Sequence, residues 1–312
     1  MKSITTVTLN PAFDLHYYME SLELGKENYV QSIQCDAGGK GINISRALTV
    51  NGVANTAFAV IGEENGASFE AALQRDGIVC VPFYTPGRIR ENITLHPGKD
   101  RETRISLDTF RVRTELLESV EQELNRHCRP GDLLAFAGRN PRGLGKPEVL
   151  GMLGRLISAG VRLAVDSNSF TPEDLRLLRP WLIKPNEQEI ASFLGSPVRT
   201  PAEAAQAAAE LVRQGVAEQV MISLGGEGAV WSDGARRFAL TVPRLEHPVS
   251  TIGAGDSTIA GFLAASAQGL PLPDVLRQAV AFGTAACMTP GTQPPRPEDV
   301  AGVLAGVRVA AI

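Results

Sequence analysis

The sequence predicts an α/β protein: a doubly wound, mostly parallel sheet flanked by helices. Three observations support this. Short apolar runs alternate with helical patterns along most of the 312 residues. Within most of these runs, apolar residues are continuous rather than alternating with polar ones, as expected for strands that helices cover on both faces. Polar or glycine residues follow several runs directly, where ligands bind in such sheets: Asn10, Asp166, Asn186 and Gly225.

The elements can be placed in order along the chain. Apolar or β-branched runs predict strands at 4–9, 56–61, 133–136, 162–165, 181–183 and 219–223. Apolar residues at helical spacing predict helices at 42–50, 67–75, 115–126, 148–159 and 202–213, and the turn at 294–297 leads into a last helix. Strands joined by helices form parallel pairs with right-handed crossovers, so one sheet is expected. We therefore predict a single domain over 1–312.

Two segments, 13–37 and 82–110, interrupt this alternation. Both lack helical periodicity and contain runs typical of strands, such as YYM at 17–19 and ENITL at 91–95. Both follow core strands, so they are expected to pair as a small β-sheet over the strand ends. Such a sheet could act as a lid; a pair of ordinary long loops is the alternative.

Composition is typical of a cytoplasmic enzyme. The formal net charge of -4 does not point to nucleic acid or to an acidic membrane surface. No apolar run approaches the roughly 18 residues of a membrane span, and the N-terminal strand pattern reaches Asn10-Pro11 too early for a signal peptide. The four cysteines lie far apart without metal-ligand spacing, which favours reduced thiols. The four histidines form no pair at helical spacing and receive no role.

The segment 250–258, STIGAGDST, is the most informative part of the chain. A β-branched run ends in Gly253-Ala254-Gly255, and an apolar helix is expected over 259–267, directly after Asp256. Glycines leave N–H groups unobstructed at the positive end of a helix, which binds anions. An aspartate there could take a proton from a hydroxyl while those N–H groups hold a phosphoryl group. On this segment alone, Asp256 could equally be a helix cap.

Two further motifs each open a predicted helix. The glycine-rich turn at 37–43, AGGKGIN, offers a cation and an amide, and its spacing fits neither a Walker loop nor a dinucleotide fingerprint. A simple glycine turn is the alternative. The segment 184–189, KPNEQE, places Asn186 and Glu189 three residues apart in a first helical turn. Those side chains could hold a hydrated Mg²⁺ or form a capping box, and taken alone they favour the cap.

Two strand-end loops remain ambiguous from their residues. The three glycines of 223–229, SLGGEGA, could pass close to a nucleotide or form a tight hairpin. The segment 138–143, GRNPRG, carries two arginines that could bind phosphate through their planar forks or simply be solvated. Arg88 and Arg90 pose the same choice in the predicted lid.

Taken in order, these motifs resemble the ribokinase-like sugar-kinase family, and within it the phosphofructokinase-B branch. The similarity runs from TLNPAFD at 8–14 to the helices after Asp256. Within this branch, the motifs are most similar to those of the 1-phosphofructokinases and only slightly less similar to those of the tagatose-6-phosphate kinases. The resemblance implies an ATP- and Mg²⁺-dependent kinase of a ketohexose phosphate, with fructose 1-phosphate going to fructose 1,6-bisphosphate. Tagatose 6-phosphate or fructose 6-phosphate as substrate, or a non-catalytic sugar-phosphate sensor, are the alternatives. The missing fingerprint disfavours a nicotinamide-dependent oxidoreductase.

The resemblance also implies residue roles. Asp256 matches the family's catalytic base, and the anion hole corresponds to Gly253, Ala254 and Gly255. The sugar and its phosphate are expected at Asp14, Gly38, Gly39, Lys40, Asn43, Arg90, Asn92 and Arg139. Here Asn186 and Glu189 match the motif that places Mg²⁺ and the nucleotide phosphates, so the resemblance overrides the cap. The rest of the nucleotide is expected at Lys184, Ser223, Gly225, Gly228 and Thr251.

Two expectations concern neighbours of the site. Lys26 stands where some family members reach into the neighbouring subunit's site, which implies a homodimer formed through the lid. The family usually has Gly-Ser-Leu-Pro-x-Gly where this chain has GRNPRG, and that serine helps to hold the substrate phosphate. Arg139 adds bulk and a permanent charge, so the identity of the sugar phosphate stays open.

Whether a monovalent cation binds near 250–252 and 287–291 also stays open.

Overall fold

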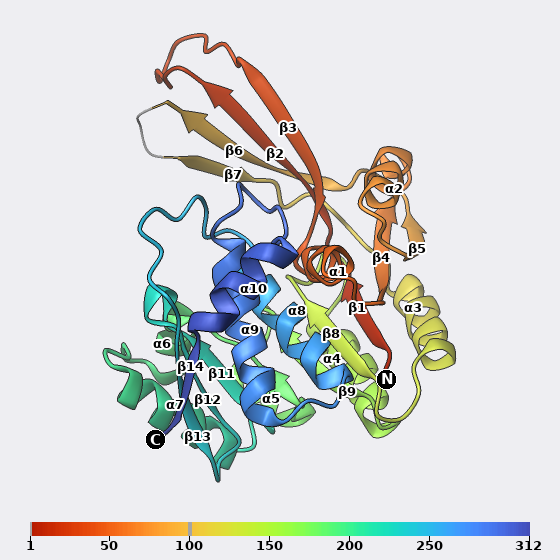
Figure 1. Cartoon of the computed structure of the whole chain (residues 1–312). Helices are drawn as coiled ribbons and strands as arrows, with labels where there is room; N and C mark the ends of the chain where they lie inside the picture. The colour runs from red at the N-terminus through yellow and green to blue at the C-terminus, as the bar shows by residue number, and fades with distance from the viewer. Residues whose placement is uncertain (1, 99–101) are drawn as a thin grey trace.

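The computed structural model describes residues 2–98 and 102–312 (Figure 1). Residues 99–101, which fall in the predicted lid segment 82–110, lie outside the described residues. Ten strands form the large sheet: β1 (Ile4–Thr8), β4 (Thr56–Gly62), β5 (Cys80–Thr85), β8 (Leu133–Ala137), β9 (Arg162–Asp166), β10 (Leu182–Ile183), β11 (Val220–Ser223), β12 (Ala229–Ser232), β13 (Arg237–Thr241) and β14 (Arg308–Ala311). Their order is β14-β13-β12-β11-β10-β9-β8-β1-β4-β5.

The predicted fold class is confirmed. All neighbouring strands from β5 to β11 pair in parallel. Among the described residues, seven helices lie between these parallel strands along the chain: α1 (Lys40–Val50), α2 (Gly66–Arg75), α3 (Thr114–His127), α4 (Lys146–Ser158), α5 (Pro172–Leu178), α6 (Glu187–Leu194) and α7 (Pro201–Arg213). Three more lie between β13 and β14: α8 (Ala254–Ala267), α9 (Leu272–Ala286) and α10 (Pro297–Gly306). Two apolar cores lie on opposite faces of the sheet. One packs α2–α7 and the other packs α1, α8, α9 and α10 against the strands.

The sheet ends in an antiparallel edge that the sequence analysis did not predict. Strands β12, β13 and β14 pair antiparallel beyond β11. The glycine loop between β11 and β12 is a tight hairpin, in which Leu224 N donates to Gly228 O at 2.9 Å. Gly228 has φ +100°, and a Cβ there would overlap the carbonyl oxygen of Leu240. The hairpin interpretation of 223–229 therefore describes its backbone, and it does not exclude a ligand beside the loop.

Helix α8 begins earlier than predicted. It starts at Ala254 rather than at 259, so Asp256 lies inside its first turn instead of just before it. Gly253, in the left-handed region at φ 78°, precedes the helix, and Ala254 and Gly255 follow the helical path. Most of α8 is buried, as expected for a helix that is apolar all round. The glycines therefore lead directly into the helix rather than forming a separate loop.

The predicted small sheet is also confirmed. It contains β2 (Ala12–Met19), β3 (Ser32–Gly38), β6 (Arg90–Pro97) and β7 (Thr103–Ser106), in the order β3-β2-β6-β7. Because β2 follows the carboxyl end of β1 almost directly, the small sheet rises from the ligand-binding edge of the large one (Figure 1). It begins later than predicted on its second segment, because β5 takes Cys80–Thr85 into the large sheet beside β4.

None of the helices in 2–98 and 102–312 combines the length and the apolar character needed to cross a membrane.

Candidate active site

Four charged side chains from distant segments meet at the carboxyl edge of the large sheet. Lys40 opens α1, Asp166 ends β9, Lys184 follows β10, and Asp256 lies in the first turn of α8. Asp166, Lys184 and Asp256 are buried, with 5–6% of each residue exposed. Lys40 Nζ donates to Asp166 Oδ1 at 3.0 Å. A Cβ at Gly255 would lie 3.0 Å from Lys184 Nζ, so this ammonium lies against the start of α8.

The charges in this cluster set each other's protonation. Burial alone would raise the pKa of Asp166, but Lys184 and Lys40 lower it below its ordinary value. Burial would likewise lower the pKa of Lys40, yet the nearby Asp166 and Asp256 raise it. For Asp256, burial dominates over Lys40 and Asn43 and raises the pKa to about 6. Asp166 is therefore a fixed negative charge, whereas Asp256 can exchange a proton near neutral pH.

The carboxylate of Asp256 is oriented by a side chain of α1. Asn43 Nδ2 donates to Asp256 Oδ2 at 2.9 Å, and Arg46 Nη1 in turn donates to Asn43 Oδ1 at 3.1 Å. Arg46 is itself buried and paired with Asp76. Within the described part of the chain, no backbone N–H of α8 donates to Asp256. Asp256 therefore does not cap its helix, and its second carboxylate oxygen has no hydrogen bond from these residues.

The start of α8 also presents N–H groups. Across 2–98 and 102–312, the N–H groups of Gly253, Gly255 and Asp256 have no acceptor, and Ala254 N has only Thr251 O at 3.4 Å. The first N–H groups of a helix lack intrahelical partners and carry the positive end of its dipole. This helix start can therefore hold an anionic group directly beside a titratable carboxylate.

The small sheet contributes a second polar network. Parallel pairing of β2 and β6 sets Asp14 opposite Asn92, and Asn92 Nδ2 donates to Asp14 Oδ1 at 2.8 Å. Arg90 bonds Asn92 Oδ1 at 2.7 Å and Asn10 Oδ1 at 2.9 Å. Burial is the main reason that the pKa of Asp14 is raised. A Cβ at Gly38 would overlap the Asp14 carboxylate, so a larger residue there would displace this carboxylate from its present position.

Arg139 lies next to this network. It is exposed on the loop after β8, which is tied to the network where Asn10 Nδ2 donates to Asn140 O at 3.4 Å. Burial lowers the pKa of Arg90, and the nearby charge of Arg139 lowers it further. Two guanidinium groups that repel each other are stabilised by an anion bound between them, especially a dianion such as a phosphate.

The segments predicted to bind nucleotide also come together. Asn186 forms a parallel bridge with Ser223, and Ser223 N donates to Pro185 O at 3.1 Å. The start of α6 therefore lies beside the glycine hairpin that contains Gly225 and Gly228. Ser250 N donates to Cys287 O at 3.5 Å, which joins the two segments named for a monovalent cation.

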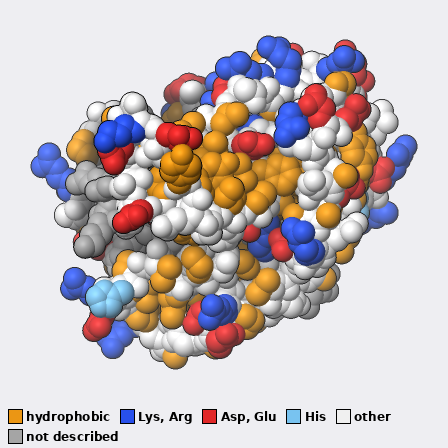
Figure 2. Space-filling view, turned by 90° about the horizontal axis from the view of Figure 1, so that it is seen from above, with side chains coloured by type: hydrophobic (Ala, Val, Ile, Leu, Met, Phe, Trp, Pro, Cys, Tyr) orange, Lys and Arg blue, Asp and Glu red, His pale blue; other side chains and the backbone are white. Residues whose placement is uncertain are grey.

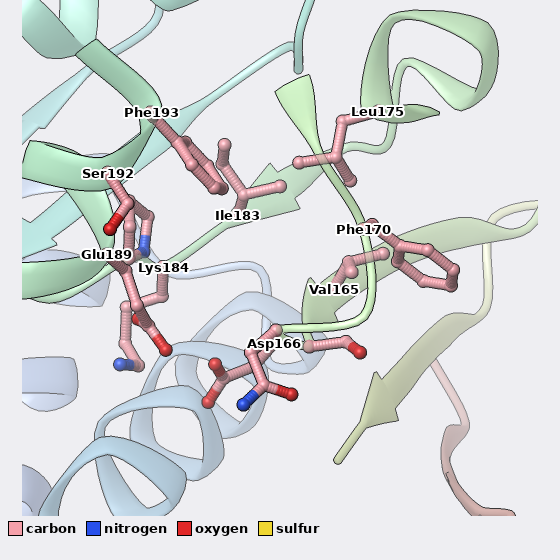
Figure 3. A pocket seen from close by; sticks show the side chains of 12 residues that line it. Val165, Asp166, Phe170, Leu175, Ile183, Lys184, Glu189, Ser192 and Phe193 are labelled. Atoms are coloured by element: carbon pink, nitrogen blue, oxygen red, sulfur yellow. The ribbon is translucent and has the colours of Figure 1, made fainter. Parts of the chain in front are cut away.

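The motif predicted to hold Mg²⁺ forms a capping box. Asn186 Oδ1 accepts from Gln188 N and Glu189 N, and Glu189 Oε2 accepts from Asn186 N, each at 2.9 Å. No cluster of three or more His, Cys, Asp or Glu in the described ranges could enclose a metal ion. Mg²⁺ in kinases keeps several waters and takes only one or two carboxylates besides substrate phosphates. Glu189, which shares a pocket with Asp166 (Figure 3) and uses only one oxygen in the cap, fits that requirement.

Two residues need separate comment. Asp166 stood out in the sequence only as a strand-end residue, although it is the partner of Lys40. Its place at the end of a buried parallel strand, before Ser167-Asn168-Ser169, indicates a position at the ligand-binding edge but does not identify Lys40 as its partner. Lys26 lies in the connection between β2 and β3, at the far end of the small sheet (Figure 1), and pairs with Glu23.

Comparison with known proteins identifies related sequences over most of the chain. The sequence model of the pfkB family of carbohydrate kinases matches residues 7–299. A 1-phosphofructokinase from Haemophilus influenzae is 30% identical over 285 residues, which cover 91% of this chain and 90% of that protein. A 1-phosphofructokinase from Rhodobacter capsulatus is 30% identical over 308 residues, covering 98% of this chain and 97% of its own length.

Solved structures share the fold. Phosphofructokinase-2 from Escherichia coli, in a complex with potassium, superposes with a TM-score of 0.90 at 24% identity, covering 98% of this chain and 99% of that one. The tetrameric inhibited form of the same enzyme gives a TM-score of 0.88 at 24% identity, with the same coverage. At 24% identity, these superpositions show a shared fold and nothing about activity or assembly.

Proposed function

The chain belongs to the pfkB family of carbohydrate kinases, and we propose that it phosphorylates fructose 1-phosphate with ATP to give fructose 1,6-bisphosphate. Membership in the family makes the protein a phosphotransferase with a hydroxyl group as acceptor. The 1-phosphofructokinases at about 30% identity favour this particular substrate. The observation that carries the chemistry is the buried carboxylate of Asp256 beside the open N–H groups of α8.

In the proposed reaction, Asp256 takes the proton of the attacking hydroxyl. The hydroxyl oxygen forms a bond to the terminal phosphorus of ATP, and the bond from that phosphorus to the leaving oxygen of ADP breaks. The N–H groups at the start of α8 and the buried ammonium of Lys184 stabilise the charge on the transferring group. Asn43 keeps the carboxylate turned toward the acceptor. Mg²⁺, when bound at Glu189, would neutralise charge on the nucleotide phosphates.

The phosphate already on the substrate would bind to the small-sheet network. Arg90 is fixed by Asn10 and Asn92, so its fork is oriented before the ligand arrives. Arg139 would supply a second guanidinium where the family usually has a serine. Asp14 and the N–H groups near Gly39 would hold sugar hydroxyls between this phosphate and Asp256. Closure of the small sheet over the site would exclude water and limit ATP hydrolysis.

We also propose a homodimer formed through the small sheet. The alternation of the strands leaves apolar side chains on the face turned away from Asp14, including Ile33 and Ile105, which are 62% and 50% exposed. Figure 2 views the molecule from above, the end at which the small sheet lies in Figure 1, and shows hydrophobic side chains gathered on this side of the molecule. A second copy would cover this face and bring its own Lys26 toward the site.

A monovalent cation, in addition to Mg²⁺, would lie between the segments 250–252 and 287–291.

A panel of sugar phosphates tests the proposed substrate. ADP release would be measured with Mg-ATP and fructose 1-phosphate, fructose 6-phosphate, tagatose 6-phosphate or fructose. We expect the highest kcat/KM with fructose 1-phosphate. A higher value with another phosphorylated ketohexose would replace the substrate and leave the phosphoryl transfer intact. Binding of the sugar phosphates without any turnover would favour the sensor instead.

A further inference from the structure

A pocket of about 210 Å³ lies between the ends of β9 and β10 and the helices α5 and α6 (Figure 3). Its walls are largely apolar and come from four elements and a loop: Val165, Phe170, Leu175, Ile183 and Phe193. The first four are 2–3% exposed, so the body of the pocket is part of the protein core. Six further lining residues are polar: Asp166, Ser167, Asn168, Lys184, Glu189 and Ser192. Of these, Asp166, Lys184 and Glu189 border the candidate active site (Figure 3). The proposed phosphoryl transfer does not use the apolar body.

The size and lining of this pocket favour a compact apolar ligand. Cavities of about 150 Å³ lined by Leu, Ile and Phe stay dry and bind benzene. Side chains that face a cavity lose dispersion contacts on that side, and a ring that fits restores them. The charges that border the candidate active site already compensate one another, because Asp166 pairs with Lys40 and lies near Lys184. A charged ligand would meet a like charge there, so a neutral one is favoured.

The pocket lies directly beneath α6, and α6 is weakly anchored. Ile190 is the only fully buried residue of this eight-residue helix. Phe193 is half-buried and faces the pocket. Glu189, one turn earlier, also lines it. A ligand packed against Phe193 would therefore restrain the same helix that positions Asn186 and Glu189.

We propose that this pocket binds a small neutral molecule of one or two apolar rings. When the pocket is occupied, the ligand restrains α6 and thereby raises the affinity for the nucleotide. The binding itself is independent of the proposed function. The coupling to nucleotide binding rests on the proposed function, because it requires that the nucleotide phosphates lie near Asn186 and Glu189. By linkage, the nucleotide would increase the affinity for the ring compound by the same factor.

Indole is a suitable probe for the binding step, and titration calorimetry and thermal unfolding are suitable measurements. The variant Phe193→Trp would fill the pocket from a half-buried position on α6. Leu194→Trp is its matched control, since Leu194 is the next residue, is 38% exposed and does not line the pocket. We expect saturable binding to the wild type and to Leu194→Trp, with a rise in Tm of about 2 °C at tenfold excess over Kd. Phe193→Trp should lose both effects. Absence of saturable binding to the wild type, or equal binding by Phe193→Trp, would overturn the proposal.

Titration of ADP with and without saturating indole tests the coupling without requiring turnover. We expect the Kd for ADP to fall about threefold in the wild type and in Leu194→Trp, and to stay constant in Phe193→Trp. An unchanged Kd in the wild type would refute the coupling. A raised Kd would show that the pocket holds the purine of the nucleotide, which also refutes it. Lack of kinase activity with every sugar phosphate would count against the proposed function while leaving the indole titration valid.

Discussion

Asp166 and Asp256 are both buried carboxylates in one cluster, yet their surroundings separate them. Asp166 bonds Lys40 and lies near Lys184, which keeps it ionised. Asp256 bonds only the neutral amide of Asn43 among the described residues, and burial raises its pKa to about 6. A carboxyl group with a pKa one unit below neutral is mostly deprotonated at pH 7 and still accepts a proton readily. One aspartate is thereby suited to fixing charge and the other to proton transfer.

This raised pKa predicts a pH dependence. In the proposed mechanism deprotonated Asp256 is the active form, so kcat/KM should be nearly constant above pH 7 and should fall about tenfold per pH unit well below pH 6. Phosphate groups of the substrates also titrate near pH 6. The residual rate of Asp256→Asn over the same range measures their contribution. Identical profiles for the wild type and the variant would remove Asp256 as the titrating group.

Arg90 makes a second prediction at the scale of one residue. Arg90→Ala should raise the KM for fructose 1-phosphate by about 10- to 100-fold, as expected for loss of a charge-assisted hydrogen bond. The KM for fructose, which has no phosphate, should change much less. Arg88→Ala is the control, because Arg88 lies two residues earlier and is exposed beside Glu91. Equal changes for both sugars would show that Arg90 does not recognise the phosphate.

At the scale of elements, the close approach of β3 to β2 places Gly38 against Asp14. Gly38→Ala would add a Cβ that overlaps the Asp14 carboxylate, which also holds Asn92 and through it Arg90. We expect the KM for the sugar phosphate to rise about tenfold or more while the KM for ATP changes less than twofold, since a small displacement in a site can cost that much. Steady-state kinetics measure both constants.

The control for this change is Gly302→Ala in α10, where a Cβ would meet nothing within 4 Å. It should leave both constants unchanged and slightly raise Tm, because alanine is the better helix former. If Gly38→Ala behaves like this control, Asp14 does not contact the sugar.

Much of the element order could be predicted from the sequence, because buried parallel strands and amphipathic helices have different periods. The edge strands β12–β14 were missed, since tight turns rather than helices connect β11, β12 and β13. The start of α8 was placed too late because glycines look like loop residues. His16 and His96, which received no role, bond each other at 2.9 Å across 80 residues, as a result of the parallel pairing of β2 and β6. Such contacts depend on strand register, which local patterns do not determine.

At the scale of the whole molecule, the small sheet carries both the groups proposed to bind the substrate and exposed apolar side chains. Ile33→Asp would place a charge in the proposed dimer interface without touching Asp14, which points to the other face. We expect the wild type to sediment as a dimer or a larger assembly at micromolar concentration and the variant to shift toward monomer. Ile312→Asp, at an exposed position of the C-terminus, is the control. Two variants with unchanged mass would place the interface elsewhere.

The candidate site exists only in the folded molecule, because Asn43, Asp166, Lys184 and Asp256 come from four separate segments. Most of these residues could be singled out in the sequence, but the pairing of Lys40 with Asp166 could not, since the two residues are 126 positions apart and meet only when α1 packs against β1, β4 and β8. In the proposed mechanism, Asp256 can accept a proton because the fold buries its carboxylate beside the start of α8.

The most direct measurement is the turnover number of Asp256→Asn with Mg-ATP and fructose 1-phosphate at pH 7.5. Asparagine keeps the size of the side chain and removes its ability to accept a proton. We predict that kcat falls by about two orders of magnitude or more and that the Kd for ADP does not rise. A variant that turns over at close to the wild-type rate would contradict the role of Asp256 as the base.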